Sequence, residues 1–172
     1  MNIKTVRNNK LPVILVSIML FLMLVLLLSP IIIIKAKFQS YAYTPEEFVT
    51  TWKTDNTGTS NSTSITIPTN SATYTYSYDI DWTCDGTFDD IGVTGNITHD
   101  YGTADTYDVC IRGTFPQIYF NNAGDKLKIL DVKQWGDVGW KSMKNAFYGA
   151  TNLTGTATDA PVWDPSATNI SF

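Results

Sequence analysis

Histidine and glutamate, two residues that commonly act in acid–base catalysis, are scarce in this chain of 172 residues. It contains one histidine, His99, and only two glutamates, Glu46 and Glu47. Ser-His-Asp and Cys-His catalysis both need a histidine that acts as a base beside a nucleophile. Thr98 and Asp100 adjoin His99, but neighbours on a strand point to opposite faces, and no Gly-x-Ser-x-Gly motif is present. We therefore predict a structural role for His99 and no enzymatic activity.

Positive charge is scarce beyond residue 38. Five of the twelve Lys and Arg residues precede Phe38, so the rest of the chain has seven of them against all sixteen Asp and Glu residues. The resulting net charge of −9 argues against nucleic acid as a partner, because proteins bind phosphate backbones with clustered Lys and Arg. An acidic surface instead suits a soluble extracellular domain.

Charged side chains are absent from residues 11–34, LPVILVSIMLFLMLVLLLSPIIII. As a helix this run would be about 36 Å long, which is enough to cross the hydrocarbon core of a membrane. Three basic residues precede it, so we predict a cytoplasmic amino terminus and export of the remainder. Residues 1–38 are accordingly a signal anchor or a signal peptide. The length of the run favours an anchor, but the small residues Ser40 and Ala42 leave cleavage open.

Cysteine motifs for metals are absent, since Cys84 and Cys110 are the only cysteines and form no Cys-x-x-Cys pair. An exported protein meets an oxidising environment, so the two cysteines can form a disulfide, although two unpaired thiols fit the sequence equally well. Alternation along residues 106–112 directs Val109 and Ile111 inward and Cys110 outward. Any bridge would therefore lie on the outside of the sheet rather than in the core.

What the chain does contain is a series of short alternating segments rich in Thr, Ser and Tyr, which predicts an all-β fold. Strands are expected at residues 48–53, 64–68, 73–82, 96–99 and 106–112. The run 73–82 has the longest unbroken alternation, and we predict that it is the central strand. Farther along, residues 126–132 are strand-like, and residues 142–148 have a spacing that predicts two helical turns ended by Gly149.

Three aspartates surround the Asp-Gly turn that follows residue 82. Asp81, Asp85 and Asp89 have the spacing of positions 1, 5 and 9 of a calcium loop, where oxygen ligands are required. Gly92 stands where such a loop normally has a bidentate Glu. Two predictions stay open for these residues: a Ca²⁺ site, or an ordinary turn in which the carboxylates accept hydrogen bonds from backbone amides.

Three tryptophans lie late in the chain, among few aliphatic residues. Trp135, Trp140 and Trp163 are candidates for stacking on sugars or for anchoring a protein partner. The alternative is that Trp135 and Trp140 pack the later residues onto the preceding β-domain.

Two segments of the chain are similar to parts of a known domain. Asp79-Ile80-Asp81-Trp82 with its Asp-Gly turn, and residues 98–109 (THDYGTADTYDV), resemble the polycystic-kidney-disease (PKD) type of Ig-like domain. That domain joins a Trp-Asp-x-Gly-Asp-Gly turn to His-x-Tyr and Gly-Thr-Tyr-x-Val. The resemblance implies an Ig-like β-sandwich at residues 48–120, after a linker at 39–47.

The later residues resemble the start of a BspA-family leucine-rich-repeat surface protein of bacteria. Met143, Ala146-Phe147 and Gly149-Ala150 match the Met-x-x-(Met/Ala)-Phe-x-Gly-Ala core of its repeats, which follow a PKD-like domain. The resemblance implies an incomplete repeat solenoid at residues 121–172 in a truncated or shortened member of the family. It also implies surface attachment or secretion and adhesion, without enzymatic activity.

The function expected from these features is that of a cell-surface adhesion or display protein that binds extracellular protein or polysaccharide. One alternative is a carbohydrate-binding accessory module of an extracellular degradation system, in which exposed tryptophans would contact the sugar. A second alternative is a structural spacer without a ligand.

Overall fold

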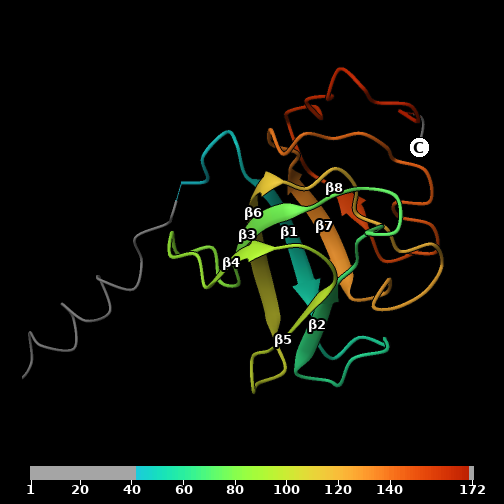
Figure 1. Ribbon diagram of the computed structural model, residues 1–172. Coiled ribbons are helices and arrows are strands. Elements are labelled where there is room, and N and C mark those ends of the chain that lie inside the picture. The colour runs from blue at the N-terminus through green and yellow to red at the C-terminus, as the bar shows by residue number, and fades with distance from the viewer. Residues whose placement is uncertain (1–41, 171–172) are drawn as a thin grey trace, which may run out of the picture. The chain divides into compact units, whose positions relative to one another are not determined.

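The computed structural model describes residues 42–170, which form eight β-strands and no helix (Figure 1). The strands are β1 (Phe48–Lys53), β2 (Ser64–Ile67), β3 (Ser77–Asp81), β4 (Asp90–Val93), β5 (Ile97–Asp100), β6 (Thr106–Thr114), β7 (Ile129–Gln134) and β8 (Thr154–Gly155). Six of them form one sheet in the order β4-β3-β6-β1-β7-β8, and β2 pairs with β5 in a second sheet. The prediction of an all-β fold is confirmed for this part of the chain.

The predicted signal segment, residues 1–38, lies outside the described residues. Within residues 42–170 the structure contains no helix of the length and hydrophobicity needed to cross a bilayer. The end of the expected linker is packed against the domain, since Glu47 is only 1% exposed. The Glu47 carboxylate accepts a hydrogen bond from the Thr44 amide at 3.0 Å, and its carbonyl accepts one from Gln134 Nε2 at 2.8 Å.

β1 lies near the centre of the large sheet and is buried on both faces. On one face, Phe48 and Trp52 are fully buried in the main core. On the other face, Val49 packs against Cys84 and Cys110 in a small separate cluster. Burial of apolar surface on both sides of β1 is a large part of what stabilises the sheet.

The two sheets share one core. Ile65 and Ile67 of β2 are fully buried there together with Trp52 of β1 and Tyr78 of β3. Side chains from two sheets that meet in one core are the defining feature of sheet-on-sheet packing. The arrangement of the described residues is therefore consistent with a β-sandwich.

The strand predicted at residues 73–82 is shorter than expected and is not central. β3 begins only at Ser77 and lies beside the edge strand β4, while β1 and β6 occupy the middle of the sheet. The residues before it form a turn, in which the amides of Thr73 and Tyr74 both donate to the Asn70 carbonyl, at 2.9 and 3.0 Å. Residues 73–76 thus continue the alternating pattern of the strand in the sequence, but the turn keeps them out of the sheet.

The residues on the two sides of the predicted domain boundary at 120 share the large sheet. β7 pairs antiparallel with β1, and β8 then pairs in parallel with β7. In the parallel ladder Asp131 lies opposite Thr154, 23 positions further along the chain. Trp140 and Trp163, again 23 positions apart, form another parallel bridge. Ser142 and Asn169, 27 positions apart, form a third parallel pairing. Two successive lengths of chain therefore lie side by side, with partners 23 to 27 residues apart.

The prediction of helical turns at residues 142–148 is wrong. These residues form turns, and Asn145 has a φ of 57°, outside the right-handed helical region. The carbonyls of Asn145 and Ala146 accept hydrogen bonds from the amides of Asn121 and Phe120, each at 3.0 Å. A helix of two turns has little stability of its own, so pairing with the neighbouring segment prevails.

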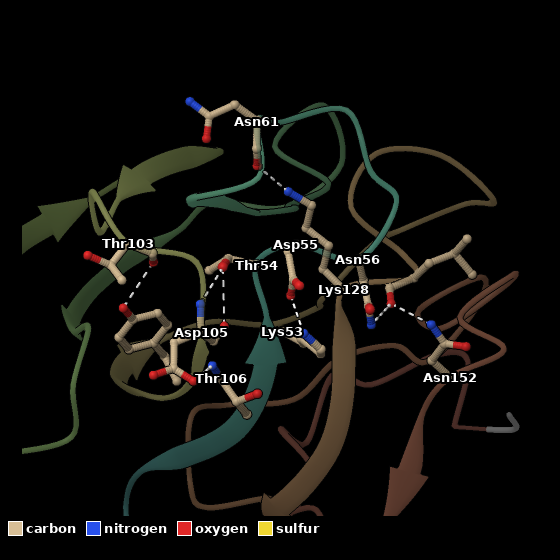
Figure 2. Close-up of polar contacts among 12 residues, drawn as sticks. Lys53, Thr54, Asp55, Asn56, Asn61, Thr103, Asp105, Thr106, Lys128 and Asn152 are labelled. Carbon is tan, nitrogen blue, oxygen red and sulfur yellow. Dashed lines mark hydrogen bonds and ion pairs between the residues drawn. The ribbon is translucent and has the colours of Figure 1, made fainter.

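A buried polar network joins the loop after β1 to Lys128, the residue before β7, and Figure 2 shows one of its contacts, between Lys128 and Asn61. Lys128 is fully buried, and its Nζ donates to the Asn61 carbonyl at 2.6 Å, the Ser64 carbonyl at 2.8 Å and Ser60 Oγ at 2.7 Å. Burial lowers the pKa of the Lys128 ammonium group, and the nearby carboxylate of Asp125 acts in the opposite direction. The network therefore holds a charged side chain inside the domain.

Candidate functional site

The three aspartates predicted as calcium ligands, Asp81, Asp85 and Asp89, are engaged with the backbone of their own turn. Each accepts at least one hydrogen bond from a backbone amide, at 2.7 to 3.1 Å. Asp81 is fully buried and accepts two, from the amides of Thr83 and Gly86. Within residues 42–170 no three His, Cys, Asp or Glu side chains are grouped to hold a metal ion. The geometry favours the amide-capping prediction over a Ca²⁺ site.

We expect the melting temperature of the protein to be the same in millimolar Ca²⁺ and in excess chelator. A cation that bound the native state with Kd well below its concentration would add about 2.7 kcal/mol at 100 times Kd, which is a shift of several degrees. Scanning calorimetry in the two buffers measures the effect. A clear rise in Ca²⁺ that is lost in Asp85→Asn, a change to an exposed turn residue, would contradict this expectation.

The predicted ligand-binding tryptophans are part of the main core or pack against it. Trp140 is fully buried, and Trp135 and Trp163 are partly buried against the same cluster. The Trp135 ring stacks on Phe48 with a centroid distance of 6.2 Å, and Trp140 Nε1 donates to the Trp135 carbonyl at 3.0 Å. These rings pack the later residues onto the β-domain.

The two cysteines are joined. Cys84 and Cys110 form a disulfide with a Cα–Cα distance of 5.3 Å. The bond lies with Val49 on the face of the large sheet away from the main core, the side on which the alternation of β6 places Cys110. Cys110 is fully buried there and Cys84 is 7% exposed. The thiols are therefore not available as nucleophiles or metal ligands.

His99 belongs to an aromatic stack. Its ring lies parallel to that of Trp82, with centroids 4.7 Å apart, and meets the Tyr101 ring edge-on at 4.5 Å. Tyr101 in turn stacks on Tyr107 and donates its hydroxyl to the Trp82 carbonyl at 2.9 Å. The histidine thus takes part in the packing of aromatic rings, in keeping with a structural role.

A hollow that no sequence pattern predicted lies where four segments converge. We call it the polar cleft; it has a volume of about 420 Å³. Its lining comes from residues 70–74, 117–119, 142–145 and 168–169. Binding pockets for small molecules occupy roughly 300–1,000 Å³, so the polar cleft falls within that range. Its residues are far apart in the sequence, and only the fold brings them together.

The floor of the polar cleft is fixed by hydrogen bonds. Gln117 is 1% exposed; its Oε1 accepts from Asn70 Nδ2 at 3.0 Å, and its Nε2 donates to the Lys144 carbonyl at 2.8 Å. The Tyr76 hydroxyl joins two of these segments, since it donates to the Gln117 carbonyl and accepts from the Asn70 amide, both at 2.8 Å. Burial raises the pKa of Tyr76 to about 12, so this hydroxyl remains a donor at neutral pH.

The sides of the polar cleft are held by pairing between strands of chain. Thr69 and Ile118 form an antiparallel bridge, and Ser142 and Asn169 form a parallel one. The Met143 amide also donates to the Asn169 carbonyl at 2.7 Å. The lining segments are therefore positioned by the same backbone pairing that builds the domain, and the cleft is preformed.

No family model, curated protein or solved structure matches this chain. The resemblances to PKD-like domains and to BspA-family surface proteins therefore stay predictions.

Proposed function

We propose that this chain is a non-enzymatic protein of the bacterial cell surface, whose all-β body adheres to or is displayed toward extracellular protein or glycan. The main support for the proposal is that a charge-free run of 24 residues, 11–34, is followed by an acidic body that contains a disulfide. The first is the pattern of an export segment, and disulfides persist in oxidising compartments outside the cytoplasm. Bound by its amino-terminal anchor, the body would face the outside of the cell.

We also propose that the body is an Ig-like, PKD-like sandwich followed by the beginning of a leucine-rich-repeat solenoid. The parallel pairs formed by β7 and the residues after it, whose partners are 23 to 27 positions apart, support stacked repeats. Side chains connect the same two lengths of chain, since the Asp159 carboxylate accepts hydrogen bonds from the amides of Trp135 and Gly136 at 3.0 to 3.1 Å. Asn152 Nδ2 likewise donates to the Leu127 carbonyl at 2.7 Å, across a separation of 25 residues.

The proposal predicts that protease added to intact cells removes the body while a cytoplasmic marker survives. A carboxyl-terminal epitope tag on the full chain, followed by immunoblotting, measures the loss. The matched control is the variant K4E/R7E/K10E, which reverses the charge before the hydrophobic run and should leave the body inside and protected. Degradation of the unaltered chain only after cell lysis would refute surface display.

A further inference from the structure

The rim of the polar cleft carries aromatic rings, hydroxyls and amides, and none of its lining residues is Asp or Glu. Tyr74 and Tyr119 are both half-buried, so each presents part of a ring to the cleft. Neither tyrosine hydroxyl has a hydrogen-bond partner within residues 42–170, and the same is true of the hydroxyls of Thr73 and Thr168. The rim thus combines flat apolar surface with unused donors and acceptors.

The floor differs from the rim because its polar groups already have partners. Gln117 and Ser142 are 1% and 2% exposed, and Gln117 Nε2 donates to Ser142 Oγ at 3.3 Å and to the Lys144 carbonyl at 2.8 Å. A ligand would therefore meet a rigid base and would form its hydrogen bonds with the rim. Rigid positioning of the binding groups lowers the cost of ordering them on association.

The chemistry of the rim selects among ligand classes. Hydroxyls and amides both donate and accept, which suits a ligand with many hydroxyl groups, and a tyrosine ring offers an apolar face to its C–H surface. Lys144 is the one charged residue of the lining, and it is exposed. The chain after residue 38 has a net charge of −9, so an anionic polymer would be repelled by most of the body.

We propose that the polar cleft binds a neutral saccharide, with Tyr119 and Tyr74 against the sugar ring and the rim hydroxyls and amides on its hydroxyl groups. This inference rests on the proposed function, since it names the ligand class and the site of the surface protein. In this proposal the glycan binds in the polar cleft and not at Trp135, Trp140 and Trp163, which belong to the core or pack against it.

The test is a glycan array of neutral and acidic saccharides, together with a peptide array. Both are probed with the full chain purified in a detergent that has no sugar headgroup. We expect binding to at least one neutral saccharide, and titration calorimetry then measures Kd for that saccharide. Tyr119→Ala should weaken binding at least about tenfold, because aromatic anchors carry much of the energy of a binding site.

The matched control is Tyr148→Ala, which removes a ring that is 59% exposed and lies outside the lining of the polar cleft. Its Kd should stay within about twofold of the unaltered chain, as expected for a ring that does not contact the ligand. Asn169→Ala is the second cleft variant; Asn169 is exposed and pairs through its backbone, so the fold survives. It should also weaken binding, and melting temperatures verify the folding of all three variants.

Binding to no neutral saccharide, binding only to acidic saccharides or peptides, or equal Kd values for Tyr119→Ala and Tyr148→Ala would each overturn the proposal. None of these outcomes contradicts the cell-surface role, provided that protease removes the body from intact cells. Protection of the body in intact cells would instead refute the surface role, whatever the array shows.

Discussion

Replacing Lys128 with alanine is expected to lower the free energy of unfolding by about 3–5 kcal/mol, the usual cost of leaving a buried charge network without one partner. The Lys128 side chain is fully buried, and its ammonium group donates to the backbone carbonyls of Ser60, Asn61 and Ser64 and to Ser60 Oγ. Chemical denaturation monitored by tryptophan fluorescence measures the difference.

The acidic side of the same network explains why the loss is large. Asp125 is 1% exposed and accepts hydrogen bonds from the amides of Thr59, Ser60 and Thr66, at 2.7 to 2.9 Å. Ser60 Oγ lies between the two charged groups, 2.7 Å from Asp125 Oδ2 and 2.7 Å from Lys128 Nζ. Without the ammonium, the Asp125 carboxylate is a buried charge with no compensating cation in the network.

Two comparison variants separate charge from packing. Lys128→Met keeps most of the side-chain volume and removes the charge, so we expect it to recover only the part of the loss that comes from the cavity. Lys126→Ala removes a lysine two positions away whose ammonium bonds Asn122 at the surface, and should cost less than about 1 kcal/mol. A Lys128→Ala loss no larger than that of Lys126→Ala would show that the network contributes little.

The same loop illustrates what the sequence predicts and what it does not. Residues 55–61 are polar and contain Gly58, which predicts a loop, and the structure has one there. The reason for the glycine comes only from packing. A Cβ at Gly58 would lie 2.4 Å from Asp125 Oδ1 and 2.6 Å from Lys128 Cε, so a side chain would displace the network. Asp125 and Lys128 lie 67 or more residues from Gly58 along the chain, so the residues around Gly58 do not indicate these contacts.

Strands with strong local patterns were predictable for a physical reason. β1 has turn-forming or polar residues on both sides, and the structure confirms it at Phe48–Lys53, the predicted range. β4 and β8 were missed because each is short and exposed, with glycine in place of an apolar side chain at one position. Such segments become strands through pairing with a neighbour, which a single sequence does not display.

The polar cleft was missed for a related reason. Tyr74 belongs to the run 73–82, which alternation predicts as one long strand, yet the turn at Asn70 takes it out of the sheet and to the cleft. Gln117 and Ser142 lie in segments without periodicity and meet only because successive lengths of chain stack beside one another. Periodic patterns identify strands and faces, whereas the cleft depends on the register between segments.

Removing the disulfide is expected to lower the free energy of unfolding by about 3.5 kcal/mol, because the bond closes a loop of 26 residues and restricts the unfolded chain. The double variant Cys84→Ser/Cys110→Ser, compared with the oxidised chain by denaturant titration, measures this change. The unaltered chain under reducing conditions is the matched control and should show a similar loss.

Because of the position of the Cys84–Cys110 disulfide, we expect its removal to leave the packing of the main core unchanged. Cys84 and Cys110 lie with Val49 on the outer face of the large sheet, separate from the main core. The serine variant should therefore keep the near-UV circular dichroism of the aromatic core while its denaturation midpoint falls. Asp81, opposite Cys110 in the β3–β6 ladder, still accepts the amides that close the turn. Equal midpoints with and without the bond would mean that the turn alone restrains this loop, and that an oxidising compartment contributes nothing to the stability of the body.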